Sequence, residues 1–291
     1  MRFTLTHDTR YRYNAPVPLS HHVVRLAPRD LPAQRPIEHQ LHIDPAPSVI
    51  SQHIDYFGNT VCVFTMEQSH AELLIRSTSV VEVNRPHLPN PEETTAWESV
   101  RDYCRGCQSG STLEASEFVH DSPLVTTQER YREYALHSFT PSRPVLAAAL
   151  DLTRRIHSEF RFDPTATTIA TPVEEVFRAR RGVCQDFAHF QIACLRSLGL
   201  PARYVSGYLE TDPPPGRPRL AGADASHAWV GVYCHGIGWI DVDPTNNLMP
   251  TTRHITVAWG RDFSDVSPVR GVVLGGGAHA LEVGVDVLAQ G

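Results

Sequence analysis

The chain has 291 residues, of which 41% are hydrophobic and 20% charged, and a formal net charge of −6 at pH 7. This length allows two domains and a core that needs neither disulfides nor metal. An acidic balance disfavours nucleic acids and anionic membranes as partners, because both attract basic surfaces. The sequence opens without a signal-peptide pattern and contains no run of ~18 apolar residues, so we expect a cytoplasmic protein whose six cysteines stay reduced.

Residues 1–85 predict a domain of antiparallel β-structure. Polar and apolar residues alternate over 39–44 and 73–83, as they do in strands with one buried face. Proline and glycine interrupt the segment about every ten residues, which is typical of a β-sandwich or an open barrel. No cluster of reactive side chains occurs in this segment, so the sequence assigns no chemistry to it.

Residues 86–142 predict a linker with helical parts. Three prolines within 85–91 end the β-segment, because proline cannot continue a strand or a helix. Cys104 and Cys107 form a CxxC pair further along. A zinc site would need two more ligands and a redox pair would need a βαβ context, and the sequence shows neither. We interpret the pair as structural or coincidental.

Residues 143–291 predict the catalytic core, with a C-terminal strand. A helix with an apolar stripe spans about 145–156, and a second helix begins just after Gly182. Cys184 lies in the first turn of this second helix. There, unpaired backbone N–H groups and the helix dipole favour a thiolate and could bind an oxyanion.

A cysteine at this position could also serve only for packing, as many free cysteines do. Cys194, in the middle of the same helix and among apolar neighbours, fits that description better. Cys184 is instead followed by two polar residues, Gln185 and Asp186, which we interpret as candidates for the substrate cleft.

A strand at 202–209, a loop rich in proline and glycine at 211–225 and a strand at 227–233 follow. The loop is a candidate for the rim of a substrate cleft. Period two in the second strand places His227, Trp229 and Tyr233 on one face, opposite small apolar residues.

A glycine-containing turn at 236–238 then leads into a strand with two aspartates, Asp241 and Asp243. If Tyr233 pairs with Trp239 across this turn, Asp243 lies diagonal to His227, at about 7–8 Å between backbones, which two side chains can bridge. Asp241 falls on the same face. The spacing therefore leaves both aspartates open as partners of the histidine.

Cysteine, histidine and aspartate together are suited to nucleophilic attack on a carbonyl. The thiolate attacks, the imidazole moves a proton between the thiol and the leaving group, and the carboxylate orients the imidazole and stabilises its charged form. We therefore interpret Cys184 and His227 as catalytic and Trp229 as a further cleft candidate. A metal hydrolase would need clustered ligands such as HExxH, which the sequence lacks.

Three segments resemble motifs of the transglutaminase-like superfamily in its bacterial form: RGVCQDFA at 181–188, SHAWV at 226–230 and GWIDVDPTN at 238–246. In that family the acid precedes a Pro-Thr or similar pair, so the resemblance selects Asp243 as the catalytic acid and leaves Asp241 as a cleft candidate. Residues 1–85 and 260–271 are similar to segments that flank the core in bacterial members. The resemblance implies an α+β protein, with an N-terminal antiparallel β-sandwich-like domain followed by a papain-like core. In such a core, a cysteine-bearing helix packs on an antiparallel sheet.

The resemblance also implies cysteine-dependent acyl transfer through a thioacyl intermediate. The substrate would be a peptide or protein with a glutamine or another amide, peptide or isopeptide bond. We expect hydrolysis rather than cross-linking, because water needs no dedicated binding site. An amine-acceptor transglutaminase and a non-catalytic binding module are the alternatives, although a degenerate member would be expected to have lost one of the three residues. No acidic cluster resembles the calcium sites of animal transglutaminases, so we expect no cofactor and no metal.

Overall fold

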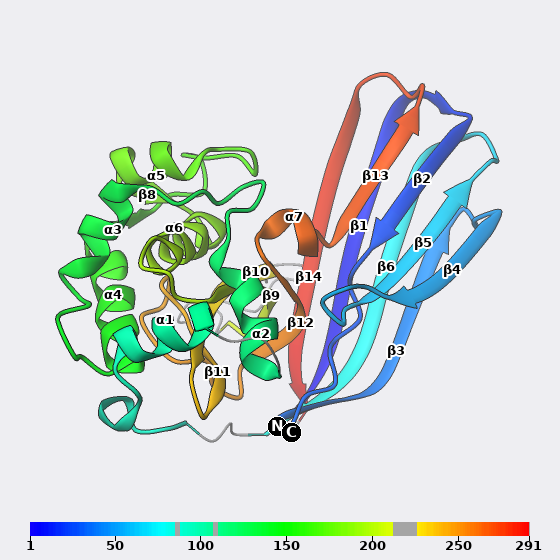
Figure 1. Ribbon diagram of the computed structural model, residues 1–291. Helices are drawn as coiled ribbons and strands as arrows, with labels where there is room; N and C mark the ends of the chain where they lie inside the picture. Colours follow the sequence, from blue (N-terminus) through cyan, green and yellow to red (C-terminus); the bar gives the residue numbers. More distant parts are fainter. Residues whose placement is uncertain (85–87, 107–109, 212–225, 291) are drawn as a thin grey trace, which may run out of the picture.

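The computed structural model describes residues 1–84, 88–106, 110–211 and 226–290. It has two parts, a β domain of long strands and an α+β core, and the two chain ends lie side by side in the β domain (Figure 1). None of the described helices is long and apolar enough to span a membrane.

The β domain consists of two four-stranded antiparallel sheets. Their strand orders are β14-β1-β6-β3 and β13-β2-β5-β4. Side chains from both sheets, such as Ile75 and Phe64, meet in a shared buried cluster, so the domain is a sandwich. The strands are β1 (Arg2–Val17), β2 (Leu19–Val24), β3 (Gln34–Asp44), β4 (Val49–Ile54), β5 (Thr60–Met66), β6 (His70–Val83), β13 (Val269–Leu274) and β14 (His279–Gln290).

The two C-terminal strands correct the domain division made from the sequence. We assigned 143–291 to the core, but β13 pairs with β2, and β14 pairs with β1 in a register that places Arg2 opposite Gln290. The β domain is therefore completed by residues 269–290, and the core is an insertion between its two parts. Local alternation predicts that a segment is a strand but not which distant strand it joins, which is why the division failed here.

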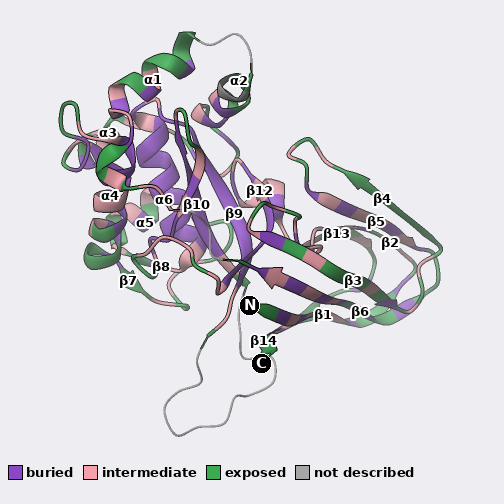
Figure 2. Ribbon diagram, turned by 90° about the horizontal axis from the view of Figure 1, so that it is seen from below, coloured by how far each residue is buried: buried purple, intermediate pink, exposed green. Residues whose placement is uncertain are grey.

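The core is built on a third antiparallel sheet with the order β11-β10-β9-β12. The helix α6 packs on one face of this sheet, as expected, and Figure 2 shows β9 and β10 buried over most of their length. The core strands are β7 (Arg161–Phe162), β8 (Arg181–Gly182), β9 (Ala202–Leu209), β10 (Ser226–Cys234), β11 (Gly238–Val242) and β12 (His254–Gly260).

Three of the described helices, α3, α4 and α5, pack against α6. The helices of the core are α1 (Trp97–Gly106), α2 (Ser111–Ser116), α3 (Glu129–Leu136), α4 (Val145–Glu159), α5 (Val173–Ala179), α6 (Cys184–Ser197) and α7 (Phe263–Val266), with short 3-10 turns at Pro91–Glu93 and Glu117–Val119. Trp97 of α1 and Tyr131 of α3 belong to the same buried cluster as α6. The described part of 86–142 is thus a layer of the core and not a linker, which also corrects our division. Cys104 is buried in α1, whereas Cys107 lies outside the described residues.

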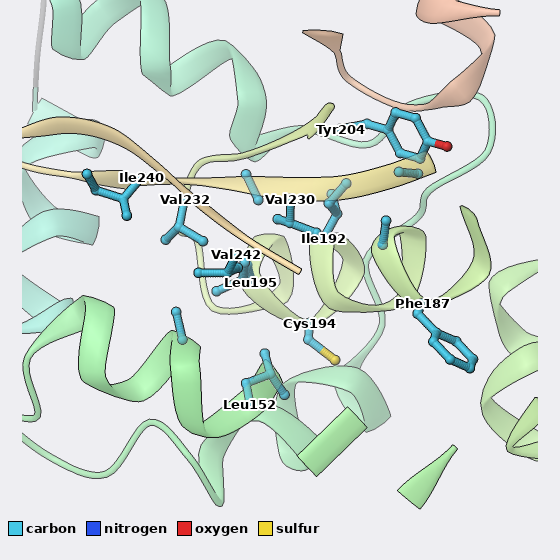
Figure 3. Close-up of a cluster of buried hydrophobic side chains, with 14 of the residues drawn as sticks. Leu152, Phe187, Ile192, Cys194, Leu195, Tyr204, Val230, Val232, Ile240 and Val242 are labelled. Atoms are coloured by element: carbon cyan, nitrogen blue, oxygen red, sulfur yellow. The ribbon is translucent and has the colours of Figure 1, made fainter. Parts of the chain in front are cut away.

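Apolar side chains of α6 fill the space against the sheet. Ile192 and Leu195 lie beside Val230 and Val242, as Figure 3 shows. Cys194 is completely buried in this cluster, and burial raises the pKa of its thiol well above the usual value. This cysteine therefore has the packing role that the sequence predicted for it, and the packing fixes α6 relative to β10.

Candidate active site

Cys184 is the first residue of α6, and the turn before it is held in place from two sides. Gly182 in β8 pairs in parallel with Phe162 in β7. A Cβ atom at position 182 would lie 2.5 Å from Oδ2 of Asp186, so only glycine leaves room for that carboxylate. The thiol is partly exposed at the helix start, where the first backbone N–H groups have no acceptor within the helix.

The side chains of Asp186 and Gln185 hold this turn. Oδ2 of Asp186 accepts hydrogen bonds from the backbone N–H of Val183 at 2.8 Å and from the hydroxyl of Thr167 at 2.6 Å. Burial raises the pKa of the Asp186 carboxyl. Nε2 of Gln185 donates to the carbonyl of Ile169 at 3.1 Å. The structure thus gives both cleft candidates a part in shaping the backbone around Cys184.

The structure brings His227 and Asp243 together as the strand register predicted. Tyr233 pairs with Trp239, and Val230 pairs with Val242. Nε2 of His227 is 2.8 Å from Oδ2 of Asp243, and the His227 side chain also hydrogen-bonds Cys184. Because Asp243 occupies Nε2, Nδ1 is the ring nitrogen left for the thiol. Cysteine, histidine and aspartate therefore form one continuous chain of contacts.

This chain determines the charge of its members. Burial alone would lower the pKa of His227, but the hydrogen bonds to Asp243 and Cys184 outweigh it and raise the pKa to about 10. Burial would raise the pKa of Asp243, and the hydrogen bonds from His227 and His254 instead hold it well below its usual range. At neutral pH the carboxylate is ionised and the imidazole beside it is stabilised in its charged form.

Trp229 and Asp241 lie together on the sheet face turned away from α6. The indole N–H of the completely buried Trp229 donates to Oδ2 of Asp241 at 2.9 Å. Both residues line a cavity of about 1050 Å³ between this face and the β domain, together with Arg203, Trp239 and Phe57. Cys184 and His227 are not among the described residues that line it, although the ring centroids of His227 and Trp229 lie 6.0 Å apart. The predicted rim, 211–225, lies outside the described residues from 212 onward.

Two residues around Asp243 escaped the sequence analysis. Asn246 donates from Nδ2 to Oδ2 of Asp243 at 2.8 Å, and its position directly after the Pro-Thr pair could have indicated this role. Nε2 of His254 lies 3.1 Å from the same oxygen. His254 is the first residue of β12, and no motif marks it in the sequence.

The ligand atoms of His227, Asp243 and His254 lie within 4.8 Å of one another, a grouping that could in principle hold a metal ion. Their spacings of 2.8 and 3.1 Å are those of hydrogen bonds, and Asn246 donates to the same carboxylate oxygen. We therefore describe the group as a hydrogen-bond network and assign no metal to it.

A cysteine at a helix start, beside a histidine and an aspartate on a sheet, is typical of a class of cysteine-dependent enzymes. The comparisons with known proteins point to the same class. Residues 3–82 match the family described as "Bacterial transglutaminase-like N-terminal region", and residues 134–244 match "Transglutaminase-like superfamily". The chain belongs to this superfamily. The expected α+β fold, with an antiparallel β-sandwich-like domain and a transglutaminase-like core, is confirmed.

Several relatives extend over the whole chain. An uncharacterized protein of Mycobacterium tuberculosis is 41% identical over 296 residues, covering 99% of this chain and 92% of that protein. An uncharacterized protein of Mycobacterium leprae is 32% identical, with 98% of both chains covered. A protein-glutamine gamma-glutamyltransferase of Pseudomonas aeruginosa is 36% identical over 108 residues, which are 36% of this chain and 16% of that enzyme.

The fold also has a solved counterpart. A crystal structure of a candidate cysteine protease from Cytophaga hutchinsonii superposes with a TM-score of 0.78 at 21% sequence identity, covering 100% of this chain and 92% of that one. At this identity the likeness establishes the fold. The family match independently assigns residues 134–244 to the transglutaminase-like superfamily.

Proposed function

We propose that the protein is a cysteine-dependent acyl-transfer enzyme that hydrolyses amide bonds in peptides or proteins. Cys184 is the nucleophile, His227 the general acid and base, and Asp243 the residue that orients His227. The observation that carries the proposal is the uninterrupted contact from Asp243 Oδ2 through His227 to Cys184, on a helix start that presents backbone N–H groups.

The reaction follows from this geometry. The Cys184 thiolate attacks the carbonyl carbon of the substrate, a C–S bond forms, and the carbonyl electron pair moves to the oxygen, which the N–H groups at the start of α6 stabilise. When the tetrahedral intermediate collapses, the C–N bond breaks and His227 gives its proton to the departing amine. Water then transfers a proton to His227 and attacks the thioacyl carbon, releasing the acid and the thiolate.

The proposal also names the molecule that accepts the acyl group from Cys184. Water is favoured because it needs no binding site of its own. The amine-acceptor reaction is the second candidate, since the chain is similar over about a third of its length to an enzyme named for transferring glutamyl groups. That stretch covers 16% of the relative, so its activity does not pass directly to this chain.

A thiol-directed activity probe tests the nucleophile. We expect a chloroacetamide probe to label the wild-type protein and to fail with Cys184→Ala. Cys62 is a partly buried thiol of the β domain, so Cys62→Ala is the matched control and should label as strongly as the wild type. Equal labelling of the wild type and Cys184→Ala would refute the assignment of the nucleophile.

The acceptor can be tested on the same protein. Glutamine-containing peptides are incubated with a labelled primary amine, and the products are identified by mass spectrometry. Cleaved or deamidated peptide supports hydrolysis, whereas peptide that carries the amine supports the second candidate. A wild-type protein that labels at Cys184 but shows no adduct or product with any peptide would support the binding-module alternative.

A further inference from the structure

His254 makes a contact with the proposed catalytic carboxylate that no family motif assigns. It lies in β12, beyond the segment 134–244 that matches the superfamily, and only 5% of the residue is exposed. Its Nε2 is 3.1 Å from Oδ2 of Asp243, which is itself completely buried. A second imidazole therefore approaches the oxygen that also contacts His227.

The carboxylate is held by five hydrogen bonds. Oδ1 accepts from the backbone N–H groups of Thr245 and Asn246 at 2.9 and 3.1 Å. Oδ2 accepts hydrogen bonds from His227 at 2.8 Å, from the Asn246 amide at 2.8 Å and from His254 at 3.1 Å. Because an ionised carboxylate only accepts, each imidazole must carry its proton on Nε2 when it bonds to Asp243. His227 then has Nδ1 free to exchange a proton with Cys184.

His254 approaches Asp243 from the opposite edge of the core sheet. Asp243 follows β11 at one edge, and His254 begins β12 at the other. Between them, Gly207 of β9 pairs with both His227 and Thr256. A Cβ at Gly207 would lie 2.6 Å from the Trp229 ring and 2.1 Å from the carbonyl oxygen of Ile255, so a larger residue there would push β10 and β12 apart. The glycine allows the two histidines to reach one carboxylate.

The ring of His254 is itself fixed by its surroundings. It packs edge-on against Trp229, with ring centroids 5.3 Å apart and planes at 88°. Trp229 in turn donates to Asp241, and the Asp241 and His254 side chains interact electrostatically. His254 is thus bounded by β10, β11 and its own strand, which leaves it little freedom to leave Asp243.

We propose that His254 is a positioning residue of the active site, whose Nε2–H holds Asp243 in the orientation that His227 requires. This inference rests on the proposed function of Cys184, His227 and Asp243. Without the donor, the carboxylate loses one of three hydrogen bonds at Oδ2 and can turn away from His227. The charged imidazole of His227 is then less well stabilised and less well oriented towards Cys184.

Alkylation of Cys184 by iodoacetamide, followed as a function of pH, tests this inference without a known substrate. His254→Phe keeps an aromatic ring beside Trp229 but removes the donor, whereas His254→Gln keeps a donor. At pH 6 we expect alkylation of His254→Phe to fall by about tenfold, the effect of losing one hydrogen bond to a charged group. The pH profile of His254→Phe should differ from that of the wild type, whereas the profile of His254→Gln should stay near it.

The controls separate the possible failures. His22→Phe replaces a buried histidine of the β domain that bonds Ser20 and should leave the alkylation profile unchanged. If His254→Phe does not fold, His254→Met is compared with His254→Gln, since the two side chains match in length. A donor-free variant with the wild-type profile overturns the role of His254. A wild-type Cys184 that alkylates no faster than Cys62 instead contradicts the proposed function itself.

Discussion

His7 and His22 of the β domain and His227 of the core are all largely buried but have different partners. In the β domain, His7 and His22 contact hydroxyl groups, those of Thr9 and Ser20 among them, and burial lowers the pKa of each to about 4. In the core, His227 is almost as buried, but it contacts Asp243 and its pKa is raised to about 10. Burial alone makes a histidine neutral, and a carboxylate partner reverses the effect.

This difference in partners explains why the sixteen histidines in the sequence are not sixteen candidate catalytic residues. A hydroxyl can satisfy either tautomer of a neutral ring, so the β-domain histidines fit into the sandwich as polar packing residues. A carboxylate fixes the protonated nitrogen and keeps the ring able to exchange a proton elsewhere. Among the three histidines compared, only His227 contacts a carboxylate, and only its pKa is raised.

The largest expected effect comes from giving His227 a neutral partner, as the histidines of the β domain have. Asp243→Asn replaces the carboxylate with a neutral amide, so the pKa of His227 should fall towards that of the β-domain histidines. We expect the rate of thioacyl formation on Cys184 to drop by about three to four orders of magnitude. The drop is measured by stopped-flow with an activated ester.

Asp241→Asn is the matched control for that variant, because Asp241 contacts Trp229 rather than His227. It should retain most of the rate. A larger loss in Asp241→Asn than in Asp243→Asn would mean that the wrong aspartate has been assigned.

A smaller effect is expected where the two parts of the molecule are joined. The completely buried Asn59 of the β domain accepts from the backbone N–H of Trp259 at 3.0 Å and donates to its carbonyl at 2.9 Å. Asn59→Ala leaves both groups of β12 without this partner, and we expect a loss of about 1–3 kcal/mol in the free energy of unfolding. Urea denaturation measures this loss.

Asn14→Ala, an exposed change in the same domain, should be within about 0.5 kcal/mol of the wild type. Asn59→Ala should also slow alkylation of Cys184, because His254 lies on the strand that Asn59 holds. Equal unfolding free energies for the two alanine variants would show that the side chain of Asn59 does not hold β12.

A further effect concerns the pH dependence of stability. The pKa of His22 is about 4 in the folded protein and about 6.5 when unfolded, so its contribution is complete above pH 6.5 and is lost as the pH falls towards 4. The pKa of His227 is raised to about 10, so its contribution is complete below pH 6.5 and is lost as the pH rises towards 10.

Calorimetry should therefore show the Tm falling on both sides of neutrality. His22→Phe should flatten only the acidic side, and His227→Gln only the alkaline side. If His22→Phe instead altered the alkaline side, the assignment of the two limbs to the two regions would be wrong.

The sequence predicted those parts of the site that depend on local pattern. The helix start placed Cys184, and the turn at 236–238 set the register that brings Asp243 to His227. The choice between Asp241 and Asp243 needed the family resemblance. His254 could not be predicted, because its role depends on β12 pairing with β9 across the sheet. For the same reason, the partners of β13 and β14 could not be predicted, since long-range pairing is specified by the completed fold and not by any single segment.

The pairing of β1 with β14 also has a consequence for how the protein is made. Its register joins positions 288 residues apart, Arg2 and Gln290, so one edge of the first strand stays open while the entire core is synthesised. Closing so long a loop is slow and costs conformational entropy, whereas the core sheet and α6 involve nearer partners. The core sheet and α6, which carries Cys184, can therefore fold before the sandwich is closed. Until β14 pairs with β1, the first strand keeps an open edge, which is a site for unwanted pairing with other chains.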